Sequence, residues 1–472
     1  MMRAVVRKEL RALWRDGRFA VLVLSLALLL AGIVVASAQQ HRTMAEEKRD
    51  VAAIVRDQWD AQGDKHPHRG AHFGLYAFRP DSPLAGIDPG LNDFWGQALW
   101  LEPHRRNLAR FRPAADEAPS VRFGQPTPAF ALITLLPLLI IALAFHSVSD
   151  ERESGTLRML HSAGLASGRL LLGKLLTLLV VVAVLLLLVL GGGLALAAGA
   201  GPWPPDALGR GALLAMGYLL YGAVFVALAL AASAWMPTSR LSLFALLALW
   251  IAFVFAVPRL GAAVAQSAVP LPAAEHFWAG IQRDYTQGLP GDQDLAARGR
   301  AFDAELLQRH GAQRVEDLPF GVAAARRLAR DAYADRVHAL HFDALWERYA
   351  RQERWLRAVA LFSPAVAMRS ISMKMAGTDL SHQQHFEAQA ETYRREVNAS
   401  IDRWDIDNTQ GITSFEDRYA DNRLWRSIAP FHYTPPRLGF ALRAVWPDLA
   451  VLLGWVLVAG ALLRASVRKL RP

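Results

Sequence analysis

The sequence predicts an all-α membrane protein: six transmembrane helices with both termini in the cytoplasm, plus a mainly helical extracytoplasmic domain. Of its 472 residues, 53% are hydrophobic and only 20% are charged, a lower charged fraction than soluble proteins usually carry. The apolar residues gather in uncharged runs, and the stretches between these runs are rich in Arg, Asp, Glu and His. This alternation indicates membrane spans joined by aqueous segments rather than one large core.

The net charge of +10 raises nucleic-acid binding as an alternative, since basic proteins attract phosphates. Most of the excess lies in short segments that flank the apolar runs, as topology signals do. The aqueous parts show no recognisable nucleic-acid-binding motif, so we expect no nucleic-acid partner. The chain contains no cysteine, which excludes disulfides, thiol catalysis and thiolate metal sites.

Six segments are long enough to cross a membrane, which takes about 20 apolar residues. We predict transmembrane helices at residues 19–40, 128–149, 170–199, 209–235, 240–258 and 441–464. Pro137 should kink the second helix, and the third is so long that it must tilt or break at its run of three glycines, Gly191, Gly192 and Gly193. The sixth requires Arg443 or Asp448 to lie near the membrane interface.

The first apolar run could alternatively be a signal peptide, because Ala36, Ser37 and Ala38 resemble a cleavage site. A signal peptide has a short basic leader, whereas this leader is long and is patterned as an amphipathic helix. We therefore expect an uncleaved first span.

Lys and Arg in the short flanking segments predict the orientation of the spans. The leader 1–18, the loop 150–169 and the tail 465–472 are basic, whereas the loop between the third and fourth spans lacks Lys and Arg. We therefore expect a multi-pass protein of the bacterial cytoplasmic (inner) membrane with both termini in the cytoplasm. Segments 41–127 and 259–440 would form extracytoplasmic inserts on the periplasmic side.

The two inserts should pack together as one mainly helical domain, since each directly follows or precedes a span. Residues 321–362 predict a long helix that ends before Pro364, and residues 381–404 predict another with Ser381 as its N-cap. Residues 42–61 should continue the first span outwards. The Gly- and Pro-rich stretch 63–90 should be irregular.

The segment 149–174 is the most informative motif. It could be a solvated loop whose charges only set topology. However, its acidic residues are not needed for that purpose, and their position at the start of a short helix suits the helix dipole. The candidate site residues of this segment are Asp150, Glu151, Arg152, Glu153, Gly155, Thr156 and Leu157.

This segment resembles the signature of type-2 ABC exporter permeases (the ABC-2-type transporter permease family), a Glu-Arg/Lys-Glu-x-Gly-Thr-Leu motif between the second and third spans. The resemblance implies that it forms the coupling helix that docks on a separate ATPase. The leader is similar to the family's interfacial helix, with Lys8, Glu9, Arg11, Trp14 and Arg15 as its candidate residues. An amphipathic membrane anchor is a compatible interpretation.

The resemblance covers all six spans but departs in one respect. Shorter members join the last two spans by a compact re-entrant hairpin, whereas this chain carries the insert 259–440 there. Residues 363–386 resemble a subfamily with such an external domain, in which the domain would carry specificity for a substrate or partner.

The resemblance implies a non-catalytic permease subunit of an exporter, working with two copies of an ABC ATPase and a second permease chain, identical or related. Since the sequence lacks a GxxxxGK[ST] phosphate-binding loop, ATP and Mg²⁺ would be bound by the partner, and no cofactor by this chain. Apart from His146 and the Arg and Lys residues at their ends, the spans hold essentially no charged residues, which disfavours an ion-coupled transporter. An apolar path would suit lipid-like cargo.

Two other functions remain open. A mechanotransmission subunit would act on a periplasmic protein through the external domain without moving a solute. A membrane-anchored enzyme would use the external histidines.

These histidines also bear on metal binding. His338 and His341, like His382 and His385, are spaced to share a helical face, while His66, His68 and His72 form a loose cluster in a loop. Such groups bind zinc or copper when further ligands approach. Because carboxylate or cysteine partners are missing from the pattern, we predict no metal site, with His382 and His385 as the strongest of these weak candidates.

Overall fold

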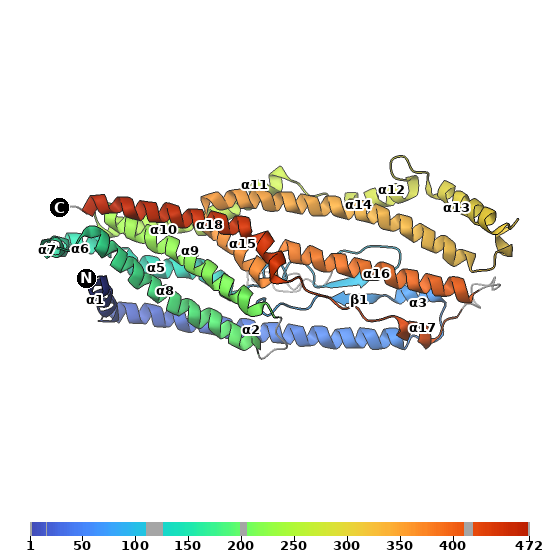
Figure 1. The fold of residues 1–472 in the computed structure, drawn as a ribbon, viewed down its shortest axis with the longest axis horizontal. Helices are drawn as coiled ribbons and strands as arrows, with labels where there is room; N and C mark the ends of the chain where they lie inside the picture. Colours follow the sequence, from blue (N-terminus) through green and yellow to red (C-terminus); the bar gives the residue numbers. More distant parts are fainter. Residues whose placement is uncertain (1, 16, 110–125, 199–204, 410–418, 471–472) are drawn as a thin grey trace.

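The structure is a computed structural model that describes residues 2–15, 17–109, 126–198, 205–409 and 419–470. It is an elongated molecule with a helix bundle at one end and a slender, mostly helical domain at the other (Figure 1). Within the described residues, six helices are long and apolar enough to cross a membrane: Phe19–Asp60, Pro128–Glu153, Ser167–Ala198, Ala207–Trp235, Ser239–Ala268 and Leu438–Leu470. The predicted all-α class with six spans is confirmed.

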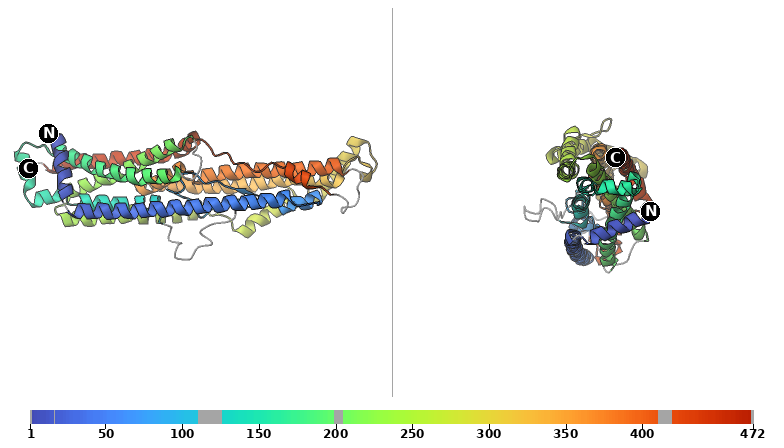
Figure 2. Two further views of the ribbon diagram at one scale, coloured as in Figure 1. Left: turned by 90° about the horizontal axis from the view of Figure 1, so that it is seen from below. Right: turned by 90° about the vertical axis from the view of Figure 1, so that its left-hand side faces the viewer.

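The bundle is built from long helices that begin and end close to the predicted spans. Their bounds are α1 Met2–Arg15, α2 Gly17–Asp60, α5 Pro128–Ala144, α6 Ser149–Glu153, α7 Thr156–Ser162, α8 Ser167–Ala198, α9 Ala207–Trp235, α10 Ser239–Ile251, π-helix η2 Ala252–Ala256, α11 Val257–Ala268, α18 Leu438–Ser466 and the terminal turn η6 Val467–Leu470. The helix α1 and the terminal turn η6 lie at the same end of the bundle in Figure 1 and in the left view of Figure 2.

Two of these helices differ from the expected spans in instructive ways. α2 continues unbroken to Asp60, so Ala36, Ser37 and Ala38 lie inside a helix. α8 does not break at its glycine run, although each helical glycine costs about 0.5–1 kcal/mol relative to alanine. Gly193 is buried where a Cβ would lie only 3.2 Å from Ile87 Cγ1, so close packing retains the helix there.

The distal domain draws on both inserts. The elements of the two inserts are α3 Pro67–Phe73, β1 Leu75–Phe78, β2 Ala98–Leu101, α12 Ala274–Gln287, α13 Leu295–His310, the 3-10 turn η3 Val315–Asp317, α14 Val322–Val359, the 3-10 turn η4 Ala360–Phe362, α15 Pro364–Ala376, α16 Leu380–Asn408 and α17 Asn422–Ser427. The two strands pair antiparallel, with Leu75 opposite Leu101.

Two local expectations need correction. Asp379, not Ser381, caps α16, because its carboxylate accepts a hydrogen bond from the Ser381 amide. The stretch 63–90 is only partly irregular, since α3 and β1 lie in it. The His66 ring accepts a hydrogen bond from the His68 amide and Pro67 occupies the first turn, a combination that starts a helix despite the surrounding glycines.

Side chains of the two inserts share one core. The Trp59 and Trp425 rings meet edge to face at 5.9 Å, and Trp59 Nε1 donates a hydrogen bond to the Trp425 carbonyl at 2.9 Å. Lys65 and Ala420 form an antiparallel bridge. Gly70 fits against the Trp425 ring, where a Cβ would come within 2.2 Å. The distal part of the molecule is therefore one domain made from two separate chain segments.

Part of the second insert returns to the bundle. The turn between α14 and α15 lies beside the fifth and sixth spans, because Ser363 Oγ donates to the Phe253 carbonyl at 2.6 Å and Trp455 Nε1 donates to the Ala360 carbonyl at 3.0 Å. Along α15, Ser372 Oγ lies 3.1 Å from Tyr218 OH on α9. Our sequence analysis had assigned all of 259–440 to the external domain without distinguishing this segment.

A buried ion network fastens α15 in place. Lys374 Nζ lies 2.7 Å from Asp448 Oδ2 on α18 and 2.7 Å from Glu353 Oε1 on α14, and the Lys374 and Asp448 side chains are 3% and 2% exposed. Arg357 completes the network beside Asp448 at 3.8 Å. Lys374, on a helix outside the six spans, thus neutralises Asp448. This ion pair explains the buried carboxylate, which therefore does not indicate an ion pathway.

We expect Lys374→Met to lower the free energy of unfolding by about 3–5 kcal/mol, because it leaves a buried carboxylate unpaired. The double variant Lys374→Met/Asp448→Leu should recover most of this loss. The control Arg351→Met, at an exposed position, should change stability by less than about 0.5 kcal/mol. Denaturant unfolding in detergent micelles measures the stability of all three variants. If Lys374→Met were as stable as the wild type, the proposed role of Lys374 in the ion network would be refuted.

Candidate functional site

The segment singled out from the sequence forms two short helices at the end of the bundle that carries both termini. α6 and α7 lie there beside α1 (Figure 1). They are separated at Gly155, whose φ of +74° is in the left-handed region that side chains with a Cβ rarely adopt. Gly155 therefore provides the turn that lets α7 leave the direction of α6.

The inner side of α6 is fixed to the turn between α9 and α10. Arg152 Nη1 donates to the Met236 carbonyl at 2.8 Å and Nη2 donates to the Ala234 carbonyl, so the guanidinium satisfies carbonyls at the C-terminal end of α9. Glu153 Oε1 accepts from the Ser239 amide at 2.6 Å and from its hydroxyl at 3.0 Å. These two candidate residues therefore serve as anchors.

Hydroxyl groups extend this anchorage. Ser233 Oγ on α9 accepts hydrogen bonds from the amides of Val148 and Ser149 at 3.0 and 3.1 Å. Ser149 Oγ lies 2.8 Å from Ser239 Oγ. The first amides of α6, which have no partner within their own helix, are thus satisfied by a neighbouring span.

Lys174 joins three helices at this end. Its ammonium group, on α8, is 3% exposed and lies 3.1 Å from Glu9 Oε2 on α1 and 3.0 Å from Glu151 Oε1 on α6. Lys8 contacts the same two carboxylates from the solvent side, at 2.8 and 3.2 Å. The predicted interfacial helix and the predicted coupling segment are therefore connected through one buried cation.

Glu9 shows the electrostatic consequence. Burial opposes its ionisation, but the charges of Lys174 and Lys8 outweigh this effect and lower the pKa of Glu9 below its ordinary 4.5. Because the folded-state pKa lies below the unfolded value, the stabilising contribution is present above pH 4.5 and is lost as the pH falls through the lower folded-state pKa. At neutral pH the network is intact.

Close packing reinforces the ion network. α1 crosses α8 at Gly173, where a Cβ would lie 2.4 Å from Val5 Cγ1. Leu157 is buried in the main core together with Val5. The glycine thus permits the approach that brings Glu9 within reach of Lys174.

The outer side of the segment faces solvent. Asp150 and Arg158 are exposed, and the Met159 side chain on α7 is 73% exposed. Methionine is one of the residue types enriched in protein interfaces, and its exposure leaves Met159 available for such a contact. On α1, Arg11, Trp14 and Arg15 are exposed, as suits a helix lying in a membrane interface.

The sequence analysis missed several members of this site. Met159 and Lys174 lie in the segment 149–174 but were not among its candidate site residues, and Ser233 and Ser239 were not considered. Lys174 could have been found, since it is a lone charge at the start of an apolar span. The two serines could not, because their role depends on which spans are neighbours.

The external histidine pairs are occupied by structural contacts. His382 Nδ1 contacts Asp379, and its Nε2 lies 3.4 Å from Arg210 Nη1, which places a positive charge where a metal would have to sit. His385 Nδ1 lies 3.3 Å from Tyr433 OH. His338 Nδ1 contacts the Ala334 carbonyl, and His341 Nε2 contacts Asp284. Each of these four rings therefore has at least one nitrogen engaged by a neighbouring group.

We expect Lys174→Met to release α1 from the bundle, because α8 loses its ion pairs with Glu9 and Glu151 and only the exposed Lys8 is left between the two carboxylates. Amide hydrogen exchange in α1 and α6 should accelerate at least tenfold in the full-length protein, while exchange in α16 stays unchanged. Lys469→Met, an exposed lysine at the same end of the molecule, is the matched control. Unchanged protection of α1 in Lys174→Met would contradict the proposed link.

Comparison with known proteins agrees with this geometry. Residues 117–277 match the model of the ABC-2 family transporter protein, a range that includes α5 to α10. Residues 274–434 match a domain of unknown function (DUF3526), which corresponds to the second insert. No curated protein matches the chain. The two matches together are those expected of an ABC-2 family permease, a multi-pass membrane subunit of an ABC transporter, with an additional DUF3526 domain.

Proposed function

We propose that this chain is the permease subunit of an ABC exporter and that α6 and α7 receive a separate ATPase. The main support for the proposal is that one side of this segment is bonded to the spans, whereas the other side is exposed. Its inner side is held by Arg152, Glu153 and Lys174, while its outer side displays Met159 among exposed charges. A rigid attachment behind an exposed contact surface is what force transmission from a partner requires.

The contacts define which helices a push on α7 would reach. α6 is bonded to the ends of α9 and α10 through Arg152 and Glu153. Through Lys174 it is joined to α8 and α1. Closure of the partner ATPase on ATP would therefore move α1, α6 and the ends of three spans together, and this movement would change the accessibility of the path between the spans.

Orientation in the membrane is part of the proposal. We place the end with α1, α6 and α7 in the cytoplasm, because α1, the basic loop 150–169 and the basic turn η6 are all at that end (Figure 1) and positive flanks favour the cytoplasm. The distal domain would then lie in the periplasm of a bacterium.

A second permease chain fits the uneven burial of the spans. Only 11% of the apolar window of the first span and 17% of that of the fifth are buried within this chain, against 72% for the second. Lipid covers such faces in a monomer. In an ABC transporter with two ATPase subunits, a second permease would pack against part of them, and we propose that it does so here.

Mechanotransmission remains the second candidate, and the long helices favour it. α2 has 44 residues and α14 has 38, which correspond to about 66 and 57 Å at 1.5 Å per residue. α2 begins in the bundle and ends in the distal domain without interruption (Figure 1). Movement of the bundle would thus be transmitted to the distal domain, where a periplasmic partner could respond. ATP-driven movement of cargo in proteoliposomes would exclude a purely mechanical role.

We expect Met159→Asp to weaken association with the ATPase by about tenfold or more, since it removes an exposed apolar contact of the kind that dominates interfaces. Permease-dependent stimulation of ATP hydrolysis should fall in parallel. The folded permease should be unaffected, because the side chain makes few internal contacts. Pull-down and ATPase assays with the reconstituted complex provide both readouts.

Two comparisons make this test specific. Gln308→Asp introduces the same charge at an exposed position of the distal domain and should leave both readouts unchanged. Charge reversal at Glu151 and Glu153 should abolish stimulation through loss of the inner contacts, with membrane insertion retained. Normal association and stimulation in Met159→Asp would show that α7 is not the docking surface.

A further inference from the structure

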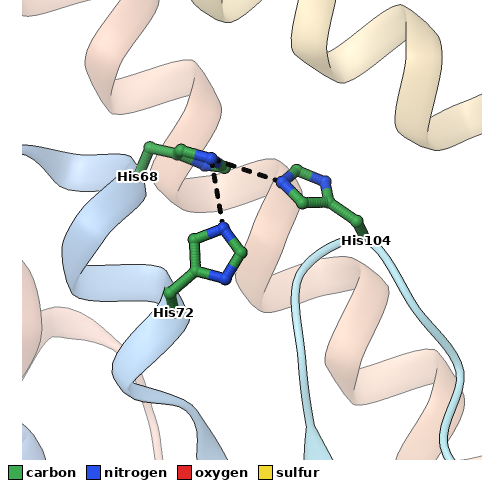
Figure 3. Close-up of side chains that lie close together, drawn as sticks. All are labelled: His68, His72 and His104. Atoms are coloured by element: carbon green, nitrogen blue, oxygen red, sulfur yellow. Dashed lines mark hydrogen bonds between the residues drawn. The ribbon is translucent and has the colours of Figure 1, made fainter.

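We propose that His68, His72 and His104 form a zinc site that ties the two inserts of the distal domain together. His68 and His72 lie one turn apart on α3, and His104 follows β2 in the chain. Figure 3 shows the three rings turned toward one another from these two elements. The sequence analysis treated His66, His68 and His72 as a loop cluster, and it did not include His104. His66 instead caps α3.

Two of the three distances between the ring nitrogens match tetrahedral zinc. His68 Nε2 lies 3.2 Å from His72 Nε2 and 3.3 Å from His104 Nε2, and ligand atoms of all three lie within 4.8 Å of one another. Zinc–nitrogen bonds of about 2.0–2.1 Å in a tetrahedron separate two ligand nitrogens by about 3.3 Å. Square-planar copper would bring neighbouring nitrogens to about 2.8–2.9 Å. Since His72 is exposed, rotation of its side chain can close the remaining gap.

Asp331 orients His104 as a metal ligand. Asp331 Oδ1 on α14 lies 2.7 Å from His104 Nδ1, and a carboxylate can only accept, so Nδ1 carries the proton. In the neutral ring, Nε2 then presents its lone pair to the other two histidines. A carboxylate behind a histidine ligand is the usual outer partner of zinc-bound imidazole.

Hydrogen bonding among the three rings leaves the cluster incompletely satisfied. If His68 Nε2 carries a proton, that single proton faces the lone pair of His104 and the Nε2 of His72 at similar distances. If His68 Nε2 carries no proton, its lone pair faces the lone pair of His104 Nε2. One cation at the centre would accept all three lone pairs at once, which no arrangement of protons can do.

The surrounding charge favours a cation. Arg327 lies near His68 and contributes to its electrostatic environment, but its guanidinium is held by both Asp402 and Asp405, each at 2.7 Å. Two carboxylates thus outweigh one arginine, and Asp331 adds a further negative charge. The site is partly open to solvent, so an ion can enter, and a water molecule can complete the coordination.

The site has a defined structural effect. α3 and His104 belong to the first insert, whereas Asp331 belongs to the second. Zinc binding would strengthen the bond between His104 and Asp331 and so hold the two inserts together. This inference is independent of the proposed coupling to an ATPase.

The test is isothermal titration calorimetry with ZnCl₂ on the full-length protein in lipid nanodiscs, after treatment with a chelator. We expect one zinc ion per chain for the wild type. His72→Gln and His104→Gln should each weaken binding at least tenfold, and Asp331→Asn should weaken it by about 10–100-fold. His276→Gln, at an exposed position on α12, is the matched control and should bind as the wild type does.

A second readout separates binding at this site from adventitious binding to other histidines. Zinc should raise the thermal unfolding temperature of the wild type and of His276→Gln, because a ligand that binds only the folded state stabilises it. It should not raise that of His104→Gln. No saturable zinc binding by the wild type, or equal binding by the wild type, His72→Gln and His104→Gln, would overturn the proposal. So would saturable binding of CuCl₂ without binding of ZnCl₂.

Discussion

The buried ammonium group of Lys174 is the constraint on which the proposed coupling site depends. A buried charge is stable only when it is paired, and the two carboxylates that pair with it come from α1 and α6. Neither helix can move away from α8 without removing one of the two carboxylates that pair with this charge. Arg152 and Glu153 tie α6 to the adjoining ends of α9 and α10 in the same way. A segment that looks like a polar loop in the sequence is therefore a rigid extension of the bundle.

The same principle holds the rest of the molecule together. Lys374 fastens α15 to α14 and α18, and Arg327 fastens α14 to two aspartates of α16. In the distal domain, Arg394 on α16 pairs with Glu391 and donates to the Pro103 carbonyl of the first insert at 2.6 Å. The chain has no cysteine. Buried cations shared between distant segments therefore provide the links that disulfides often provide in secreted domains.

Local patterns in the sequence were enough to predict the spans and the longest external helices but not their partners. The spans follow from apolar length, and the long helix α14 follows from a run without Gly or Pro that ends before Pro364. The role of Asp448 did not follow, because Lys374 belongs to a segment that sequence alone assigns to the outside. His104 was missed because it is remote in the chain from His68 and His72. His68 and His72, four residues apart, were a signal that a helical interpretation of α3 would have revealed.

The central claim, that α7 faces an ATPase, can be tested directly because the chain has no cysteine of its own. A single cysteine at Met159 can carry a photoactivatable cross-linker without background labelling. Illumination of native membranes should join Met159→Cys to a protein with a phosphate-binding loop of the ABC ATPase type, identified by mass spectrometry. The same cross-linker at Arg309→Cys, on the exposed far end of α13, should not capture this protein. Capture from Arg309 but not from Met159, or from neither position in membranes that contain the ATPase, would contradict the account.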